Sequence, residues 1–258
     1  MTSSVLDRAE VLKVLFYPRR EEKPAFIPPS ARPVAFEVEP GLPISGRLYP
    51  AGARAPAILF FHGNGEIAAD YDDLAPLYTR LGITLLVADY RGYGTSGGVP
   101  TARHLLADAV AIFGHTGRVL ESYGLTPSGL HVMGRSLGSA AAIEVALSAG
   151  EQLAGLIVES GFSDTFGLLA RLGLRVVGAD EEHDGFGNAF KLSHVRTAAL
   201  VIHGQSDVLI PAGDGQELYR RCGATDKKLV LIPGAGHNDL MLVGVAAYFE
   251  AIRAFVQH

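Results

Sequence analysis

Short runs of apolar residues alternate along this chain with longer stretches in which apolar residues recur every three or four positions. Uninterrupted apolar runs of about five residues are typical of strands buried on both faces of a sheet, whereas the longer period is typical of amphipathic helices. The runs predict strands over 57–62, 84–89, 130–133, 155–159, 198–203 and 228–232. The amphipathic stretches predict helices over 5–16, 67–81, 102–123, 216–221 and 240–256, with another in the Ala-rich run that follows Ser136.

Two segments near the N-terminus show strict alternation instead. Residues 34–39 and 44–49 place apolar side chains at every second position, and Pro40-Gly41 separates them. Alternating strands joined by a tight turn predict an antiparallel hairpin at the edge of a sheet. The proline-rich and charged residues 18–33 predict an extended arm across the surface.

Strands that alternate with helices predict an α/β fold with a doubly wound, mostly parallel sheet. No internal repeat or linker divides residues 1–258, so we expect a single domain. In such sheets the ligand site lies at the carboxyl ends of the strands. The residues that follow each predicted strand are therefore the candidates for chemistry.

Composition narrows the classes of function. Apolar residues make up 48% of the 258 residues and charged residues 19%, which supports a large buried core. A net charge of −5 without a Lys/Arg cluster argues against a nucleic-acid partner. The N-terminus lacks the pattern of a secretory signal, and no apolar window is long enough to span a membrane. Together with the single cysteine, Cys222, these features predict a cytoplasmic protein without stable membrane insertion.

A Gly-Arg-Ser-Leu-Gly motif joins the strand over 130–133 to the Ala-rich helix. Gly134 and Gly138 flank Ser136 at two residues on each side, as a sharp strand-to-helix turn requires where the two backbones nearly touch. Such a turn presents the serine hydroxyl at a helix N-terminus, where free N–H groups favour developing negative charge. Ser136 is thus the candidate nucleophile, and the alternative is a glycine-framed turn with an incidental serine.

An acid and a histidine follow two other predicted strands, in the order Ser136, Asp207, His237. A serine hydroxyl is a weak nucleophile unless a neighbouring base takes its proton, and a neutral histidine is such a base near pH 7. Asp207 would orient His237 and stabilise its protonated form. Glu159, at another strand end, is the alternative acid, whereas Asp239 is expected to cap the last helix.

Acyl transfer also needs two N–H donors for the oxyanion of the tetrahedral intermediate. We expect one from Leu137, directly after the serine, and the other from Asn64 in the glycine-rich stretch 62–65. Loss of one such donor typically costs about 3 kcal/mol of transition-state stabilisation.

The remaining histidines favour structural roles. His62 and His203 each precede a glycine at a strand end, and we expect them to form hydrogen bonds beneath the site. His183 lies in the acidic run 180–184, where a solvated loop is favoured over a metal site. We therefore expect no metal and no cofactor.

From about residue 57 to the C-terminus, the chain resembles the α/β-hydrolase-fold serine hydrolases. The motifs that carry the resemblance are Phe61-His62-Gly63-Asn64-Gly65, Asp89-Tyr90-Arg91-Gly92-Tyr93-Gly94, Gly134-Arg135-Ser136-Leu137-Gly138, His203-Gly204-Gln205-Ser206-Asp207 with Ile210-Pro211, and Gly234-Ala235-Gly236-His237-Asn238-Asp239. Within this fold, the chain is most similar to the Bem46-like and depalmitoylating α/β-hydrolase-domain proteins. The resemblance implies hydrolysis of a small-molecule carboxylic ester or thioester through an acyl-enzyme.

Residues 160–188 show no clean strand period and stand where this fold usually carries a lid. We expect a short lid over a partly open site that accepts small or medium acyl groups. Phe162, Phe166 and Leu169 are the candidates for its apolar pocket, and the alternative is the face of an ordinary packing helix. Two other functions stay open: an amide or peptide hydrolase with the same triad, and a non-catalytic ligand-binding protein on this fold.

Overall fold

A computed structural model of the protein describes residues 4–21 and 27–257. Within these residues, an eight-stranded sheet with the order β1-β2-β4-β3-β5-β6-β7-β8 forms the centre. The strands are β1 (Arg32–Glu39), β2 (Leu42–Tyr49), β3 (Ala57–Phe61), β4 (Thr84–Ala88), β5 (Leu130–Arg135), β6 (Gly155–Glu159), β7 (Ala199–Gly204) and β8 (Lys227–Ile232). The α-helices are α1 (Ala9–Leu15), α2 (Ala75–Thr79), α3 (Ala102–Ser122), α4 (Gly138–Ala149), α5 (Thr165–Arg171), α6 (Glu181–Asp184), α7 (Asn188–His194), α8 (Ala212–Arg221), α9 (Leu240–Val243) and α10 (Val245–Val256). Short 3₁₀ helices are η1 (Val5–Asp7), η2 (Ala68–Tyr71) and η3 (Gly150–Gln152).

The sheet begins with the predicted hairpin. Strand β1 pairs antiparallel with β2, with Phe36 opposite Ile44, and β2 pairs antiparallel with β4. The neighbouring pairs from β4 through β3 to β8 are parallel. Strand β3 lies between β4 and β5, so the direction of winding reverses there. The prediction of a doubly wound, mostly parallel sheet with an antiparallel start is confirmed.

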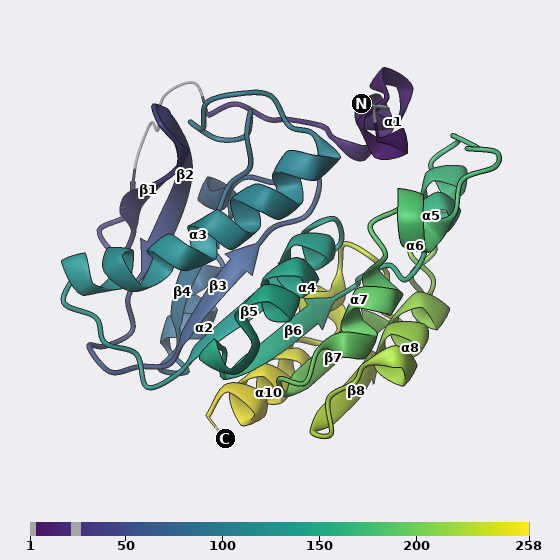
Figure 1. Cartoon of the computed structure of the whole chain (residues 1–258). Coiled ribbons are helices and arrows are strands. Elements are labelled where there is room, and N and C mark those ends of the chain that lie inside the picture. The colour runs from purple at the N-terminus through teal and green to yellow at the C-terminus, as the bar shows by residue number, and fades with distance from the viewer. Residues whose placement is uncertain (1–3, 22–26, 258) are drawn as a thin grey trace.

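Helices cover both faces of this sheet (Figure 1). Helices α3, α4, α7 and α8 pack on one face, over strand residues that include Leu59, Val132 and Val158. Helices α2 and α10 pack on the other face, over Phe60 and Met133. Because successive residues of a strand point to opposite faces, only an uninterrupted apolar run can fill both cores. This is why the uninterrupted apolar runs in the sequence predict the central strands.

The parallel strands end at a common edge of the sheet. Phe61 at the end of β3 is in register with Gly134 of β5, and Gly204 of β7 is in register with Ile232 of β8. The loops that leave these strands therefore start side by side, although they are far apart in the sequence. Ser136, Asp207, His237 and the two expected oxyanion donors, Asn64 and Leu137, all lie where the chain leaves these strands.

Three predicted helices are interrupted. The helix predicted over 5–16 consists of η1 and α1, and the one over 67–81 consists of η2 and the short α2. Pro76 lies in the first turn of α2, because its ring and missing N–H exclude it from the interior of a longer helix. The helix predicted over 240–256 divides at Gly244, where a Cβ would lie 2.3 Å from Cγ2 of Ile232.

Residues 160–188 contain the short helices α5 and α6. In the predicted N-terminal arm, Arg20 forms a parallel bridge with Gly94, and residues 22–26 lie outside the described residues. In the part of the chain that the structure describes, no helix combines the length and the apolarity needed to cross a bilayer.

Candidate active site

Ser136 lies at the sharp turn between β5 and α4. Its backbone φ is +52°, a left-handed conformation that side chains other than glycine rarely adopt. Close packing holds the turn: a Cβ on Gly134 would lie 2.1 Å from the carbonyl oxygen of Gly138. A Cβ on Gly138 would lie 2.1 Å from the carbonyl oxygen of Phe61. The N–H of Ser136 also donates to the carbonyl of Glu159 at 2.9 Å, so the neighbouring strand fixes the strained residue.

Ser136, His237 and Asp207 form one hydrogen-bonded chain. His237 Nε2 lies 3.0 Å from Ser136 Oγ, and His237 Nδ1 lies 2.7 Å from Asp207 Oδ2. The serine and the histidine are each 9% exposed, and the aspartate is 5% exposed. This geometry allows the imidazole to take the serine proton while the carboxylate stabilises the resulting imidazolium.

The surroundings of Asp207 keep its carboxylate ionised. Its Oδ1 accepts the N–H groups of Leu209 at 3.0 Å and of Ile210 at 2.8 Å. Burial alone would raise the pKa of Asp207, but hydrogen bonds from His203 and His237 outweigh it and hold the pKa well below its usual range. The residue that faces the imidazole is therefore a charged acceptor at neutral pH.

The alternative acid, Glu159, lies in a different part of the hydrogen-bond network. Its Oε2 accepts the hydroxyl of Tyr248 at 2.6 Å, and its Oε1 lies 3.2 Å from Nε of Arg135. Burial raises the pKa of Glu159, and the neighbouring guanidinium opposes that rise. Among the described residues, His237 shares its Nδ1 hydrogen bond with Asp207 and not with Glu159.

Sequence reasoning did not single out Arg135, which joins three loops of the site. Its Nη2 donates to the carbonyl of His237 and to Oδ1 of Asn238, both at 2.9 Å. Its Nη1 pairs with Glu66, whose Oε2 accepts the N–H of Gly63 at 2.9 Å. A charged residue between two glycines of a buried turn is the signal that could have found it, because a buried charge must be paired.

Asn64 and Leu137 both line the cavity at Ser136. Within residues 4–21 and 27–257, neither backbone N–H donates to a protein acceptor, so both are free to bind an oxyanion. The side chain of Asn64 is already engaged. Its Oδ1 accepts the N–H of Tyr17 at 2.7 Å and the hydroxyl of Tyr93 at 2.8 Å, which fixes this loop beside the serine.

The cavity at Ser136 has a volume of about 210 Å³. Its apolar walls come from three separate elements: Leu15 from α1, Leu168 and Leu172 from α5 and the residue that follows it, and Leu209 from the loop after β7. Apolar walls beside a polar reacting centre are typical of sites for small organic ligands.

The predicted pocket residues lie elsewhere. Phe162 and Leu169 are fully buried in the core, and the ring of Phe162 packs against that of Phe186 with centroids 5.8 Å apart. Phe166 packs, half-buried, against the same core, and none of the three lines the cavity as described. Leu168 and Leu172 are four positions apart, so they lie on the same side of a helical turn and both line the cavity. Leu169 faces the core instead.

Other polar residues around the site take structural positions. His62 and His203 are both fully buried beneath the loops. Asp239 occupies the predicted N-cap position of α9, but its carboxylate accepts the N–H of Gly236 and forms no capping hydrogen bond with the helix. His183 is exposed. Among the described residues, no group of three or more His, Cys, Asp or Glu side chains is placed to hold a metal ion.

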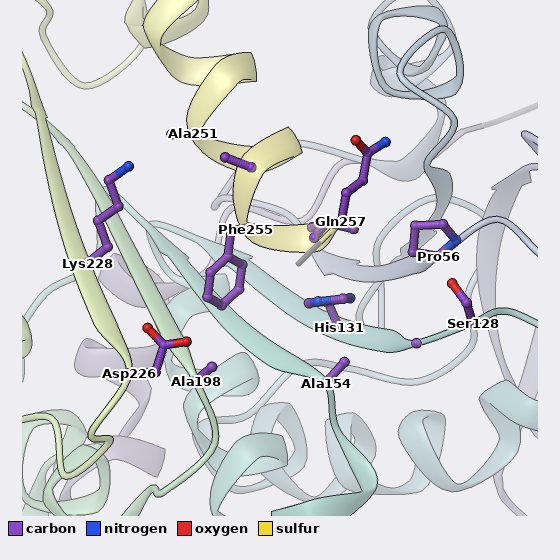
Figure 2. A pocket seen from close by; sticks show the side chains of 13 residues that line it. Pro56, Ser128, His131, Ala154, Ala198, Asp226, Lys228, Ala251, Phe255 and Gln257 are labelled. Atoms are coloured by element: carbon purple, nitrogen blue, oxygen red, sulfur yellow. The ribbon is translucent and has the colours of Figure 1, made fainter.

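A second hollow, of about 920 Å³, lies at the opposite edge of the sheet, between the amino ends of the strands and the end of α10 (Figure 2). His131 and Phe255 stand in its centre, and their rings meet edge to face. Burial lowers the pKa of His131 to about 4. The hollow is far from the carboxyl edge at which ligands of doubly wound sheets bind, and it shares no lining residue with the cavity at Ser136.

Most of the chain is similar in sequence to other proteins. It is 32% identical over 209 residues to α/β hydrolase domain-containing protein 17C of Xenopus tropicalis, which covers 78% of this chain and 61% of that protein. It is 31% identical over 207 residues to protein 17B of Homo sapiens, with 77% of this chain and 65% of that protein covered. The chain thus spans less than two thirds of the length of these relatives. An uncharacterised protein of Mycobacterium tuberculosis is 30% identical over 256 residues, with 95% and 86% covered.

Solved structures share the fold at low sequence identity. The esterase Pf2001 of Pyrococcus furiosus superposes with a TM-score of 0.72 at 20% identity, over 93% of this chain and 98% of that one. Est1E of Butyrivibrio proteoclasticus, solved with ferulic acid, superposes with a TM-score of 0.70 at 18% identity, over 87% and 98%. Residues 52–179 and 188–241 match the family described as serine aminopeptidase, S33. The chain therefore belongs to this family of hydrolases with the α/β-hydrolase fold.

Proposed function

We propose that the protein hydrolyses carboxylic esters or thioesters of small molecules through an acyl-enzyme on Ser136. The observation that carries the proposal is the chain of hydrogen bonds from Ser136 Oγ to His237 Nε2, at 3.0 Å, and from His237 Nδ1 to Asp207 Oδ2, at 2.7 Å. That the structural neighbour Pf2001 is an esterase agrees with this chemistry.

In the first half of the reaction, Ser136 Oγ attacks the carbonyl carbon while His237 Nε2 takes the hydroxyl proton. The negative charge moves to the carbonyl oxygen, which the free N–H groups of Asn64 and Leu137 stabilise. The intermediate then expels the alcohol or thiol, to which His237 returns the proton. Asp207 stabilises the imidazolium in between and keeps Nε2 directed at the serine.

In the second half, a water molecule replaces the departed alcohol or thiol beside His237. The imidazole takes a proton from this water as its oxygen attacks the acyl carbon, and the same N–H groups bind the oxyanion. Collapse of the intermediate releases the carboxylic acid, and Ser136 recovers its proton from His237. The enzyme thus needs only water as a co-reactant.

The size of the cavity favours small or medium acyl groups. A methylene group fills about the 30 Å³ that one water molecule occupies in the liquid, so 210 Å³ corresponds to about seven such groups. Residues 160–188 cover one side of this space through Leu168 and Leu172. We therefore propose that this segment acts as a short lid over the acyl chain.

Hydrolysis of p-nitrophenyl esters by wild type and by Ser136→Ala tests the proposal. We expect kcat/KM of Ser136→Ala to fall by about 10⁴-fold or more, with an unchanged melting temperature. Ser122→Ala, at an exposed serine of α3, serves as the matched control and keeps full activity. An equal rate in Ser136→Ala would overturn the assignment of the nucleophile. A wild-type Ser136 that no fluorophosphonate probe labels would favour the non-catalytic binding protein instead.

An amide or peptide hydrolase is the second candidate, because the matched family is described as serine aminopeptidase. The same residues would act, with His237 protonating an amine instead of an alkoxide. Side-by-side rates on an ester and an anilide of the same acyl group separate the two. If the protein is an esterase, we expect its ester-to-anilide rate ratio to be far larger than the same ratio for hydrolysis by hydroxide ion.

A further inference from the structure

The N-terminal helix α1 reaches the candidate active site, although it lies outside residues 52–179 and 188–241, which match the family. In Figure 1, α1 stands apart from the sheet, next to α5. Leu15, the last residue of α1, is only 2% exposed and lines the cavity that also contains Ser136. A segment outside the family match thus supplies part of the wall of the site.

Hydrogen bonds anchor the chain just before and just after α1. On one side, Oδ1 of Asp7 accepts the N–H of Ala102 at 2.9 Å, at the start of α3. On the other side, the N–H of Tyr17 donates to Oδ1 of Asn64 at 2.7 Å, and Arg19 donates to the carbonyl of Gly65 at 3.0 Å. The helix is therefore fixed to the main body of the fold and to the loop that carries Asn64.

Leu15 lines the cavity together with residues of the α5 segment. Leu168 and Leu172 form the wall on the α5 side, and helices α1 and α5 are in contact. No polar side chain is needed at such a wall, because an acyl chain is held by the apolar surface that it buries. A change in the volume of Leu15 therefore changes the space for the acyl chain directly.

We propose that α1 forms one wall of the acyl pocket and that Leu15 determines which acyl chain lengths the enzyme accepts. The proposal rests on the proposed ester hydrolysis at Ser136. Leu15 is a specificity-determining residue that touches the acyl chain, several bonds away from the reacting carbonyl.

The test is a comparison of kcat/KM for p-nitrophenyl acetate, hexanoate and decanoate. Leu15→Ala enlarges the pocket, so we expect the decanoate-to-acetate ratio to rise about tenfold or more. Leu15→Trp fills the pocket, so we expect the hexanoate-to-acetate ratio to fall by a similar factor. Leu15→Ala removes three carbon atoms, and one methylene group in an apolar pocket is typically worth about tenfold or more in kcat/KM.

Val11→Ala is the matched control. Val11 lies one turn earlier on α1 and is 1% exposed, but it does not line the cavity. The Val11→Ala variant loosens the packing of α1 about as much as Leu15→Ala does. Because it does not change the cavity wall, we expect its chain-length ratios to equal those of wild type. Equal ratios in wild type, Leu15→Ala and Leu15→Trp would overturn the proposal, as would a Val11→Ala variant with the same shift as Leu15→Ala.

The folded state of each variant is checked by its melting temperature. If Leu15→Trp does not fold, Leu15→Val removes a single methylene and is expected to shift the preference toward longer chains in the same direction as Leu15→Ala. A wild-type protein without activity on any ester would refute the proposed function itself. Activity that responds to Ser136→Ala but not to Leu15 variants would refute only the role of α1.

Discussion

The guanidinium of Arg135 donates a hydrogen bond to the backbone carbonyl of His237, with Nη2 and O 2.9 Å apart. The residue directly before the candidate nucleophile thereby holds the loop that carries its base. The same guanidinium pairs with Glu66, whose carboxylate accepts the N–H of Gly63 beside Asn64. One buried cation thus joins the segments that carry Ser136, His237 and Asn64.

Arg135→Lys keeps the positive charge but loses the planar set of donors, so the three loops are no longer held together. We expect kcat on a p-nitrophenyl ester to fall about 10- to 100-fold with little change in KM, because small displacements of reacting groups have effects of this size. Arg91→Lys is the matched control, since Arg91 is also buried and its Nε and Nη2 pair with Asp108 at 2.7 Å. A loss of kcat in the control as large as in Arg135→Lys would mean that the effect comes from general destabilisation.

Asp207 and Glu159 make a direct comparison of the two candidate acids possible. Asp207→Asn removes the charged partner of His237 Nδ1 and favours the wrong tautomer, so we expect kcat/KM to fall about 10⁴-fold. Glu159→Gln leaves that hydrogen bond intact and disturbs only the pairing with Arg135 and Tyr248. We expect its loss of kcat/KM to be at least about tenfold smaller than that of Asp207→Asn. Losses of equal size would assign Glu159 a direct part in the chemistry.

The parts of the site that the sequence predicted are those with local signals. Consecutive residues form the turn around Ser136. Each apolar run predicts a strand and thereby the position of the loop that follows it. Because β7 and β8 pair in parallel, the loops with Asp207 and His237 start at the same edge of the sheet. Local pattern and sheet topology are therefore enough to assemble the three residues.

The pocket could not be predicted in the same way. Leu15, Leu172 and Leu209 meet only through tertiary packing, and nothing in their local sequence distinguishes them from other leucines. The sequence of residues 160–188 does not show which side of α5 faces the cavity, so it predicts Leu169 where the structure has Leu168 in the wall. Faces of short helices depend on the direction of docking, which periodicity leaves undetermined.

His131 predicts a loss of stability in mild acid. Burial lowers its pKa from 6.5 to about 4, so above pH 6.5 the imidazole is neutral in both the folded and the unfolded chain. Between pH 6.5 and pH 4 the unfolded chain binds a proton that the folded chain does not. The free energy of unfolding therefore falls as the pH falls through this range, by up to about 3 kcal/mol.

Urea denaturation of wild type and His131→Gln at about pH 7.5 and pH 4.5 measures this effect. The variant lacks the titrating group, so its free energy of unfolding should decrease by about 2 to 3 kcal/mol less than that of wild type over this range. His194→Gln, at an exposed histidine of α7, is the control and should follow wild type. Parallel pH profiles of wild type and His131→Gln would contradict the lowered pKa.

We expect replacement of glycine by alanine to have opposite effects on stability at Gly138, in the turn at Ser136, and at Gly114, in α3. A Cβ at Gly138 would lie 2.1 Å from the carbonyl oxygen of Phe61, so Gly138→Ala must push α4 away from β3. We expect it to lower the free energy of unfolding by about 3 kcal/mol or more and to reduce activity with it. At Gly114, within α3, a Cβ meets no atom within 4 Å, so Gly114→Ala should stabilise the protein by about 0.5 to 1 kcal/mol. Chemical denaturation distinguishes the two variants, and a tolerated Gly138→Ala would show that the strand and helix need not approach so closely to present the serine.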